Sequence, residues 1–318
     1  MYDRDSWPKA QALLSNNANL KDVRLQFLEP TDIKNKYSFL DKLDDVGGAT
    51  YSPKDGLLNA NLLKLHYRDE AKKNGVQFYN RLWAYACRME DRIRVRAAHF
   101  GGSFESAGIR KVLTEQKSMG FAESPYYEIS AKVLVNCCGP WARTFAETFG
   151  APCDSRPVRR QVSVFECKDV DISNDGMFVD TSGVYFHSEG PNILGGYAIA
   201  DEPAGFNFNY DGEVFFQEYI WPSLYNRSTK FESLRHVTGW AGLYEVSPDH
   251  SGIVGRVPGF DNVFEAHSFS GRGAMQSYGA GLGLSELILF NKYRSLDLSP
   301  LSGERFRSGQ LISESLVI

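Results

Sequence analysis

The stretch from Asn262 to Phe290 constrains the fold more than any other, because it joins a short apolar run, a glycine turn and a long apolar run. Val263–Phe269 is expected to form a buried strand, residues 270–273 (Ser-Gly-Arg-Gly) a tight turn, and Ala274–Phe290 a buried helix. Glycines at a strand-to-helix turn let the backbone approach a ligand, and free N–H groups at the helix start favour negative charge. The stretch therefore predicts an α/β unit whose turn either binds a ligand or simply connects the two elements.

This turn does not match the dinucleotide-binding fingerprint. That motif needs a third glycine and a following βαβ unit with an acidic residue about twenty positions further on. The third-glycine position is Gln276, and the chain stops soon after the helix. Gly279, Gly281 and Gly283 would destabilise an exposed helix, so we expect this helix to pack its backbone closely against a flat surface.

Composition excludes several classes of function. The 318 residues suffice for a large core, and we expect two intertwined domains. A net charge of −4 without a basic stripe gives no reason to expect nucleic-acid binding. No apolar run reaches transmembrane length, and the first residues lack the features of a signal or transit peptide. The five cysteines form no C-x-x-C pair, so we expect reduced thiols and no metal site.

Two further segments have α/β character. Residues 59–75 predict an amphipathic helix that ends at Asn74-Gly75, followed by a strand at Val76–Tyr79. Val133–Val135 predicts a buried strand, and Trp141–Phe149 predicts a helix after a glycine-proline turn. Such pieces, separated by strand-rich blocks, are typical of an α/β domain with a second, sheet-based domain threaded through it.

The other segments predict mostly strands and a few short helices. The expected helices are 7–14, 31–40 and 212–224, and the expected strands are 23–27, 82–88, 93–98, 162–165, 177–179, 184–186 and 193–194. A polar stretch runs on through Met119, and Tyr244–Gly255 is expected to be a loop.

Five segments that follow one another in order carry a family resemblance. They are residues 47–49 (Gly-Gly-Ala) with Asp55-Gly56, residues 133–141, residues 158–162, residues 185–186 with 194–196, and residues 268–273 (Ser-Phe-Ser-Gly-Arg-Gly). Together they resemble the FAD-dependent amino-acid and amine oxidoreductases, which include D-amino-acid oxidase and sarcosine oxidase. The resemblance implies an α/β fold in which a Rossmann-like FAD/NAD(P)-binding domain is interleaved with a mostly antiparallel β-sheet substrate domain. It assigns residues 47–150 and 233–318 to the FAD-binding domain, and residues 1–46 and 151–232 to the substrate or cap domain.

The C-terminal third carries a narrower resemblance. Its segments are residues 179–186, residues 240–245 with Asp249 and Gly255, and residues 297–300 with Arg305-Phe306. These are similar to a subgroup associated with assembly of mitochondrial respiratory complex I. That resemblance implies a mitochondrial location, in the matrix or at the inner membrane, and complex I subunits or assembly factors as partners.

One element of the family pattern has no counterpart. Family members begin with a strand, a G-x-G-x-x-G turn and a helix that seat the FAD pyrophosphate, and the sequence contains no such unit. We therefore expect a fragment, a shortened gene model or a protein that has lost its flavin. We also expect the isolated chain to be unstable or to aggregate, because a missing βαβ unit exposes a sheet edge and apolar surface.

The resemblance assigns cofactor-binding residues by position. Its final turn and helix start face the flavin ring, which implicates Ser270, Gly271, Arg272, Gly273 and Ala274. Arg272 either pairs with the charge of the reduced flavin or lies on the surface. The assignment also includes Met275, where sarcosine-oxidising relatives carry a basic residue for the substrate carboxylate. It places Asn136, Gly139 and Trp141 on the phosphate or ribose side. Trp141 is alternatively a core residue.

Catalytic residues are less well defined. Arg272 and Tyr244 are the candidates, and Tyr185 and Tyr244 either line the substrate side of the ring or belong to the core. Gly242 aligns with the cysteine that some relatives link to flavin, so FAD binding is expected to be non-covalent. His250 and His267 are expected at the surface or in loops, and no acid–base role follows for Glu245 or Asp249.

Three functions are consistent with these observations. The first is a flavoprotein-family role in assembly of mitochondrial complex I, with an unknown redox substrate. The second is an FAD-dependent dehydrogenase or oxidase of amino acids or secondary amines, against which Met275 counts. The third is a non-catalytic interaction protein that retains the fold without FAD. Retained flavin without amine turnover would distinguish the first from the second.

Overall fold

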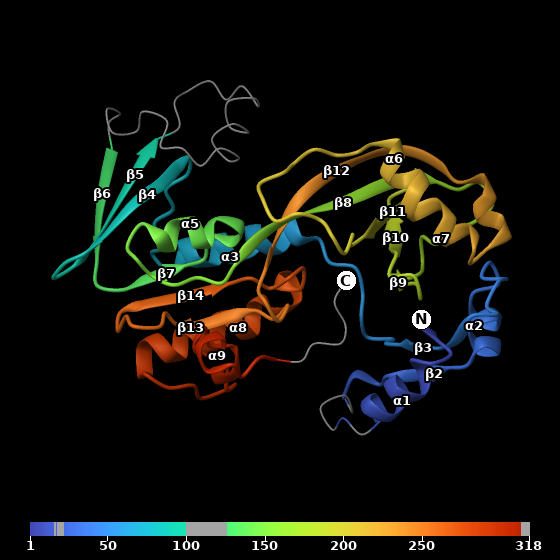
Figure 1. Ribbon diagram of the computed structural model, residues 1–318, viewed down its shortest axis with the longest axis horizontal. Coiled ribbons are helices and arrows are strands. Elements are labelled where there is room, and N and C mark those ends of the chain that lie inside the picture. The colour runs from blue at the N-terminus through green and yellow to red at the C-terminus, as the bar shows by residue number, and fades with distance from the viewer. Residues whose placement is uncertain (16, 18–21, 100–125, 313–318) are drawn as a thin grey trace.

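The computed structural model describes residues 1–15, 17, 22–99 and 126–312 of the chain (Figure 1). The polar stretch that was expected to run through Met119 lies, from residue 100 on, outside the described residues. The described strands form four sheets. The strands β8 (Arg156–Glu166) and β12 (Arg235–Val246) bridge the two halves of the molecule in Figure 1. No helix in the described ranges has both the length and the hydrophobicity that crossing a membrane requires.

The largest sheet has five antiparallel strands in the order β12-β8-β11-β10-β9. Its three shorter strands are β9 (Phe178–Val179), β10 (Tyr185–Glu189) and β11 (Asn192–Tyr197). The ladder between β8 and β12 continues from the Arg156–Val246 pair to the Glu166–Arg235 pair, with one irregularity near His236. The predicted strands between residues 162 and 194 are thus confirmed as members of a single sheet.

The register divides the side chains of this sheet between two faces. Gly242 lies opposite Arg160, and Tyr244 lies opposite Val158, two residues before Arg160. Tyr185 lies opposite Gly196, which in turn lies opposite Val162 of β8. Because side chains alternate along a strand and directly opposed residues share a face, Arg160, Tyr185 and Tyr244 belong to one face.

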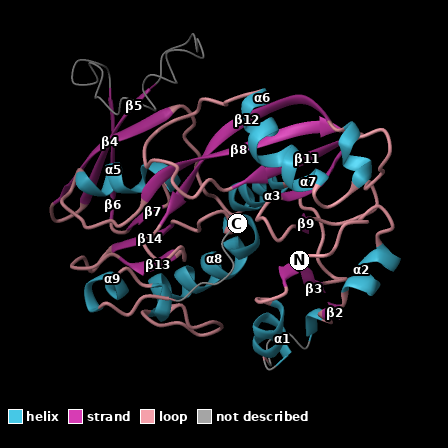
Figure 2. Cartoon of the chain, turned by 45° about the vertical axis from the view of Figure 1, so that its right-hand side comes forward, coloured by secondary structure: helices cyan, strands magenta, loops and turns pink. Residues whose placement is uncertain are grey.

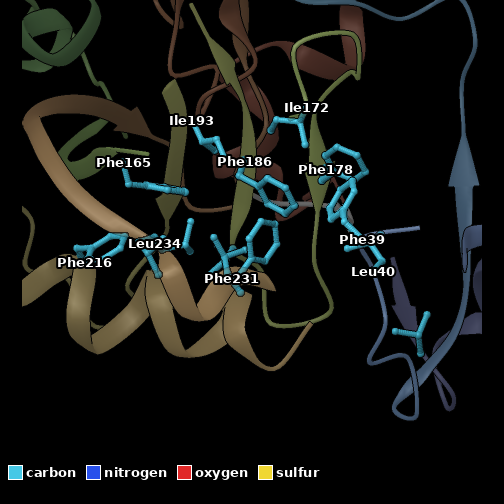
Figure 3. Close-up of a cluster of buried hydrophobic side chains, with 14 of the residues drawn as sticks. Phe39, Leu40, Phe165, Ile172, Phe178, Phe186, Ile193, Phe216, Phe231 and Leu234 are labelled. Atoms are coloured by element: carbon cyan, nitrogen blue, oxygen red, sulfur yellow. The ribbon is translucent and has the colours of Figure 1, made fainter. Parts of the chain in front are cut away.

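The other face of the sheet forms the most extensive core (Figure 3). A helical segment covers it, made of α6 (Glu213–Phe215), a π-helical turn (Phe216–Ile220) and α7 (Trp221–Tyr225) (Figure 2). This confirms the predicted helix at residues 212–224, although Val214, expected on its buried side, is exposed. The core side chains labelled in Figure 3 come from the sheet, the helical segment, the N-terminal region and the connections at residues 172 and 231–234: Phe39, Leu40, Phe165, Ile172, Phe178, Phe186, Ile193, Phe216, Phe231 and Leu234.

The N-terminal segment forms a small sheet in the order β1-β3-β2. Its elements are β1 (Tyr2–Asp3), α1 (Trp7–Ser15), β2 (Gln26–Leu28), α2 (Pro30–Lys36) and β3 (Val46–Tyr51). The Trp7 indole lies against Gly48, where an added Cβ would come within 2.2 Å of the ring. The predicted helices at 7–14 and 31–40 are confirmed with shorter bounds for the second, and the glycine segment at 47–48 belongs to a strand.

A second region contains a three-stranded sheet in the order β13-β14-β7. Strands β7 (Leu134–Asn136) and β14 (Val263–His267) are parallel, and β13 (Ile253–Arg256) is antiparallel to β14. Apolar clusters on the two sides involve α5 (Ala142–Glu147) and α8 (Gly273–Phe290) respectively. The 3₁₀ turns η4 (Thr229–Ser233) and η5 (Ser299–Leu301) and helix α9 (Glu304–Ser308) complete the C-terminal half.

The remaining elements are the sheet β4-β5-β6 and helix α3. The strands are β4 (Leu82–Met89), β5 (Ile93–His99) and β6 (Tyr126–Ala131), and the helix is α3 (Ala60–Lys73). Asn59 caps α3, since its side chain accepts a hydrogen bond from the Leu62 N–H at 3.0 Å. None of the residues of α3 is buried, although its apolar spacing predicts one buried face.

Two predictions about local structure are wrong. Val76–Tyr79 is not a strand: its residues are exposed, and no strand in the described part of the chain pairs with it. Tyr244–Gly255 is not wholly a loop, because β12 extends to Val246 and β13 begins at Ile253. Pairing with the long strand β8 extends β12 beyond the point where local sequence signals end.

Candidate functional site

The predicted strand–turn–helix unit is confirmed, and its turn has an unusual backbone. β14 ends at His267 and α8 begins at Gly273. Ser268, Ser270 and Gly271 between them have φ values of 62°, 50° and 93°. Such left-handed conformations are uncommon for residues other than glycine and are found at sites that the surrounding structure holds in place.

The turn is fixed to strand β12 by backbone hydrogen bonds. The Ser270 N–H donates to the Glu245 carbonyl at 3.2 Å, and Phe269 forms a bridge with Val246. Helix α8 has no side-chain cap at Arg272, so no capping side chain accepts hydrogen bonds from its first N–H groups. Ala274 and Met275 are exposed there, Met275 to 72%.

Tyr244 lies directly against this turn. A Cβ atom at Gly271 would come within 2.5 Å of the Tyr244 ring, so the position requires glycine for space as well as for its positive φ. Burial raises the pKa of Tyr244, partly offset by Arg160, and the negative charge of Glu245 raises it further. The phenol therefore stays protonated at neutral pH.

Arg160 shares the sheet face of Tyr244. Its guanidinium carbon lies 5.6 Å from the centroid of the Tyr244 ring, and Nη1 donates to the Arg159 carbonyl at 3.0 Å. Its buried Nε has no hydrogen-bond partner. Burial lowers the pKa of Arg160, although the nearby Tyr244, Glu202 and Tyr185 oppose this. A buried, incompletely paired cation is costly, and one that faces open space is suited to an anionic group.

Two glycines on this face differ in the space above them. An added Cβ at Gly242, opposite Arg160, would meet no atom within 4 Å. The Tyr185 hydroxyl occupies the position over Gly196, where an added Cβ would lie 2.3 Å from it. Burial also raises the pKa of Tyr185. Tyr244 raises this pKa further, and the positive charge of Arg160 lowers it. Arg160, Tyr185 and Tyr244 thus share a face on which open space lies above Gly242, and we call this space the recess.

A second glycine turn follows β7. Gly139 has φ 52° and begins the 3₁₀ turn η2 (Gly139–Trp141). Asn136, only 1% exposed, holds this turn: its amide donates to the Ala142 carbonyl at 2.9 Å and accepts from the Cys138 N–H at 3.2 Å. Trp141 stacks on Phe206 with ring centroids 5.6 Å apart.

Glu245 connects the two turns. Its Oε2 lies 4.0 Å from the Cβ position of Gly139, and its backbone carbonyl accepts from Ser270. Burial raises the pKa of its carboxyl group, while His267 and the backbone N–H groups of Phe269 and Ser268 act in the opposite direction. The structure therefore brings the turns at residues 139 and 270 to one residue, the half-buried Glu245.

The predicted site residues fall into three groups. Ser270, Gly271, Gly273, Ala274 and Met275 lie together at the turn and the start of α8. Asn136, Gly139 and Trp141 lie at the β7 turn, where the Asn136 side chain binds backbone groups of the turn itself. Arg272 contacts the loop before β13, because its Nη2 donates to the carbonyl of His250.

Sequence reasoning missed Arg160 and misplaced His267. Arg160 was part of a family segment, but only the strand register shows that it shares a face with both tyrosines. His250 is in an exposed loop as expected. The prediction that His267 is a surface or loop residue is wrong: it ends β14 and is 1% exposed. Alternation along Val263, Glu265 and His267, all buried, was the available signal.

The glycines of α8 were expected to pack against a flat surface. Gly283 does so, because an added Cβ would lie 2.5 Å from the Leu298 side chain, whereas Gly281 faces open space. Within the described residues there is no group of three or more His, Cys, Asp or Glu side chains arranged to hold a metal ion.

Comparisons with known proteins agree with this geometry. The family model described as FAD dependent oxidoreductase (DAO) matches residues 1–287. FAD-dependent oxidoreductase domain-containing protein 1 of Xenopus laevis is 34% identical over 209 residues, which are 60% of this chain and 41% of that protein. The protein of the same name from Mus musculus is 32% identical over 205 residues, 59% of this chain and 42% of that protein. The chain thus spans about two fifths of the length of the curated relatives it matches.

Two solved structures share the fold. L-proline dehydrogenase from P. horikoshii superimposes with a TM-score of 0.80 at 18% identity, covering 98% of this chain and 76% of that one. Glycine oxidase from Geobacillus kaustophilus gives a TM-score of 0.70 at 17% identity, covering 93% and 71%. The predicted fold class, α/β with antiparallel sheets as in the FAD-dependent oxidoreductases, is confirmed.

Proposed function

We propose a function from the premise that this chain belongs to the DAO family of FAD-dependent oxidoreductases. The chain would form the flavin-ring side of a non-covalent FAD site, and it would act as a flavoprotein in assembly of mitochondrial complex I. The observation that carries the FAD site is the turn at Gly271, which is packed on Tyr244 beside the incompletely paired Arg160.

The residues at this turn fit a planar, partly anionic group. The strained backbone at Ser270 and Gly271 presents the start of α8, whose first N–H groups and positive end of the helix dipole favour negative charge. Gly271, Gly273 and Ala274 would hold the ring edge through their backbone, because Gly271 and Ala274 are exposed and Gly273 is half-buried. Asn136, Gly139 and Trp141 would line the phosphate or ribose side.

Bound FAD would supply the acceptor for a hydride from a donor carbon. The residues of this chain would place that carbon and exclude water. Tyr185 and Tyr244 would line the donor side as neutral phenols, because burial raises the pKa of both. Met275 is exposed at the helix start, so no basic side chain at that position would hold a substrate carboxylate.

Arg160 favours a second candidate function, oxidation of a small anionic amine or amino acid. Its buried Nε lacks a partner, and the recess above Gly242 is open. A carboxylate in this recess would complete the hydrogen bonds of Arg160 and replace the cation that is missing at Met275. The role in complex I assembly rests instead on the subgroup segments at residues 179–186, 240–245 and 297–300.

The division into two domains stays a prediction, with residues 47–150 and 233–318 in the FAD-binding domain and residues 1–46 and 151–232 in the substrate or cap domain. So do the mitochondrial location and the partners, which would be complex I subunits or assembly factors. Proximity labelling from this chain in isolated mitochondria would test both: enrichment of complex I components is expected, and their absence from a mitochondrial sample would contradict the assembly role.

The FAD site is tested by the visible absorption spectrum and by titration with FAD. The chain should be measured beside a form that carries an upstream G-x-G-x-x-G unit, and we expect flavin absorbance in the longer form. Arg160→Gln in that form should weaken binding of a carboxylate ligand, read as a shift of the flavin spectrum, with exposed Arg156→Gln on the same strand as the matched control. A folded, colourless protein in both forms would favour the non-catalytic interaction protein.

A further inference from the structure

The five cysteines differ in what surrounds their sulfur atoms. Burial raises the pKa of Cys87 to about 11. Removal from water raises the pKa of Cys137 and, to about 11, that of Cys138, although both residues retain exposed surface. The half-buried Cys167 contacts neutral oxygens, the Lys230 carbonyl at 3.7 Å and Ser233 Oγ at 3.8 Å. Each of these four thiols is therefore either removed from water or in contact with neutral oxygen atoms.

Cys153 is different because its sulfur faces a buried imidazole. Cys153 Sγ lies 3.8 Å from Nε2 of His267, within the range of a sulfur–nitrogen hydrogen bond. The cysteine is half-buried in the connection between α5 and β8, whereas His267 at the end of β14 is 1% exposed. One side of the pair is thus fixed in the core and the other keeps contact with solvent.

The imidazole is held by acceptors on both nitrogens. Nε2 lies 3.1 Å from Oε2 of Glu265, and Nδ1 lies 2.9 Å from Oγ of Ser268. Burial alone would lower the pKa of His267, but the bonds to Cys153 and Glu265 outweigh it and raise the pKa to about 9. Glu245 is a further negative charge that acts on this imidazole. His267 therefore carries a positive charge at neutral pH.

We propose that Cys153 is a site of reversible covalent modification, at which the sulfur in contact with the His267 imidazole reacts with small disulfides of the oxidised-glutathione class. A thiolate is the nucleophilic form of cysteine, and an adjacent cation stabilises it relative to the thiol. Glu265 helps to keep the imidazole protonated, and because it contacts the same ring nitrogen as Cys153, its negative charge limits this stabilisation.

The reaction is thiol–disulfide exchange. The Cys153 sulfur forms a bond to one sulfur of the small disulfide, and the sulfur–sulfur bond of that disulfide breaks. The other half leaves as a thiolate and takes up the proton that Cys153 has lost, so one disulfide is consumed, one mixed disulfide is formed and one small thiol is released. A reducing small thiol reverses the exchange.

The test compares Cys153 with Cys167 in the same molecule, since both are half-buried. The native full chain is treated with oxidised glutathione or a limiting amount of iodoacetamide, and the modified peptides are quantified by mass spectrometry. We expect Cys153 to react first. His267→Gln should slow it by about five- to tenfold because the thiolate loses its cation, while Cys167 is unaffected. Cys153→Ser should abolish the adduct.

Unfolding provides a second readout that needs no variant. In urea the two sites should react at equal rates. If Cys153 reacts no faster than Cys167 in the native chain, the proposal is overturned. A folded His267→Gln protein with an unchanged Cys153 rate would also overturn it.

Discussion

At the scale of single residues, Gly271 is the position where the candidate site tolerates least change. Its φ of 93° and its contact with the Tyr244 ring both require glycine. Gly271→Ala should lower the free energy of unfolding by about 1–3 kcal/mol through backbone strain and displacement of the ring. The measurement is urea denaturation followed by circular dichroism.

Gly281→Ala is the matched control within helix α8. An added Cβ there meets no atom within 4 Å, so alanine should stabilise the chain by up to about 1 kcal/mol. Equal effects of the two substitutions would contradict the close packing of the turn on Tyr244.

The buried pair of His267 and Glu265 makes stability depend on pH. The pKa of His267 is raised from 6.5 to about 9 in the folded chain. The folded state therefore binds the proton more tightly than the unfolded state, and the contribution, on the order of 3 kcal/mol, is complete below pH 6.5 and is lost as pH rises to about 9. Denaturation midpoints across this range should decrease, and the decrease should vanish in His267→Gln. A flat profile in the unmodified chain would mean that the imidazole is neutral.

Residue-scale reasoning from the sequence succeeded where the backbone itself carries the signal. The Ser270–Gly273 turn could be predicted, because glycines and a following apolar run restrict the local conformation. Arg160 could not be assigned, since its neighbours Tyr244 and Tyr185 are distant in sequence and meet it only through strand register. The burial of His267 depends likewise on tertiary partners, Glu265 and Cys153.

At the scale of elements, helix α9 is attached to the β12–β13 connection by one buried ion pair. Arg305 donates from Nε and Nη2 to Asp249 at 2.7 and 2.9 Å, and also binds the Ser251 carbonyl. Burial acts to raise the pKa of Asp249, but Arg305 and the Ile312 N–H hold it well below its usual range. Removing one partner of such a pair leaves the other charge unpaired and costs about 3–5 kcal/mol.

We therefore expect Asp249→Asn to release α9 from its position. Hydrogen exchange at residues 304–312 should accelerate well before global unfolding. Arg307→Gln is the control, because the Arg307–Glu304 pair is exposed and should contribute little. Unchanged exchange in Asp249→Asn would show that α9 is held mainly by its apolar contacts.

Elements with their own periodicity could be predicted, and elements that depend on a partner could not. α3 formed as its spacing indicated, yet none of its residues is buried. Val76–Tyr79 has strand-forming residues and is no strand, because nothing described pairs with it. Strand β12 extends beyond its local signals because β8 supplies a continuous ladder.

At the scale of the whole molecule, exposed apolar surface gathers around β7 and α3. β7 is at the edge of its sheet within the described residues, and Val135 on it is 38% exposed. Leu62 and Leu65 of α3 are also exposed. Unpaired edges and apolar patches favour association, so the isolated chain is expected to self-associate as its concentration rises.

Val135→Lys should reduce this association, because a charged side chain on an edge strand opposes pairing with another chain. Val135→Ile keeps the apolar edge and serves as the control. Sedimentation velocity over a range of concentrations measures the effect. A monomer with a cooperative thermal transition at all concentrations would contradict the expected instability of the isolated chain.

The ladder between β8 and β12 has a mechanical consequence. It runs without interruption from Val246 to Gly239 and carries Arg160 and Tyr244 on the same ribbon, which also bridges the two halves of the molecule (Figure 1). Two hydrogen-bonded strands of this length form a rigid ladder. A hinge motion between the two halves would have to bend this ladder or break its hydrogen bonds. The ladder therefore keeps the spacing of Arg160 and Tyr244 constant, and a ligand would approach them from the open space above Gly242.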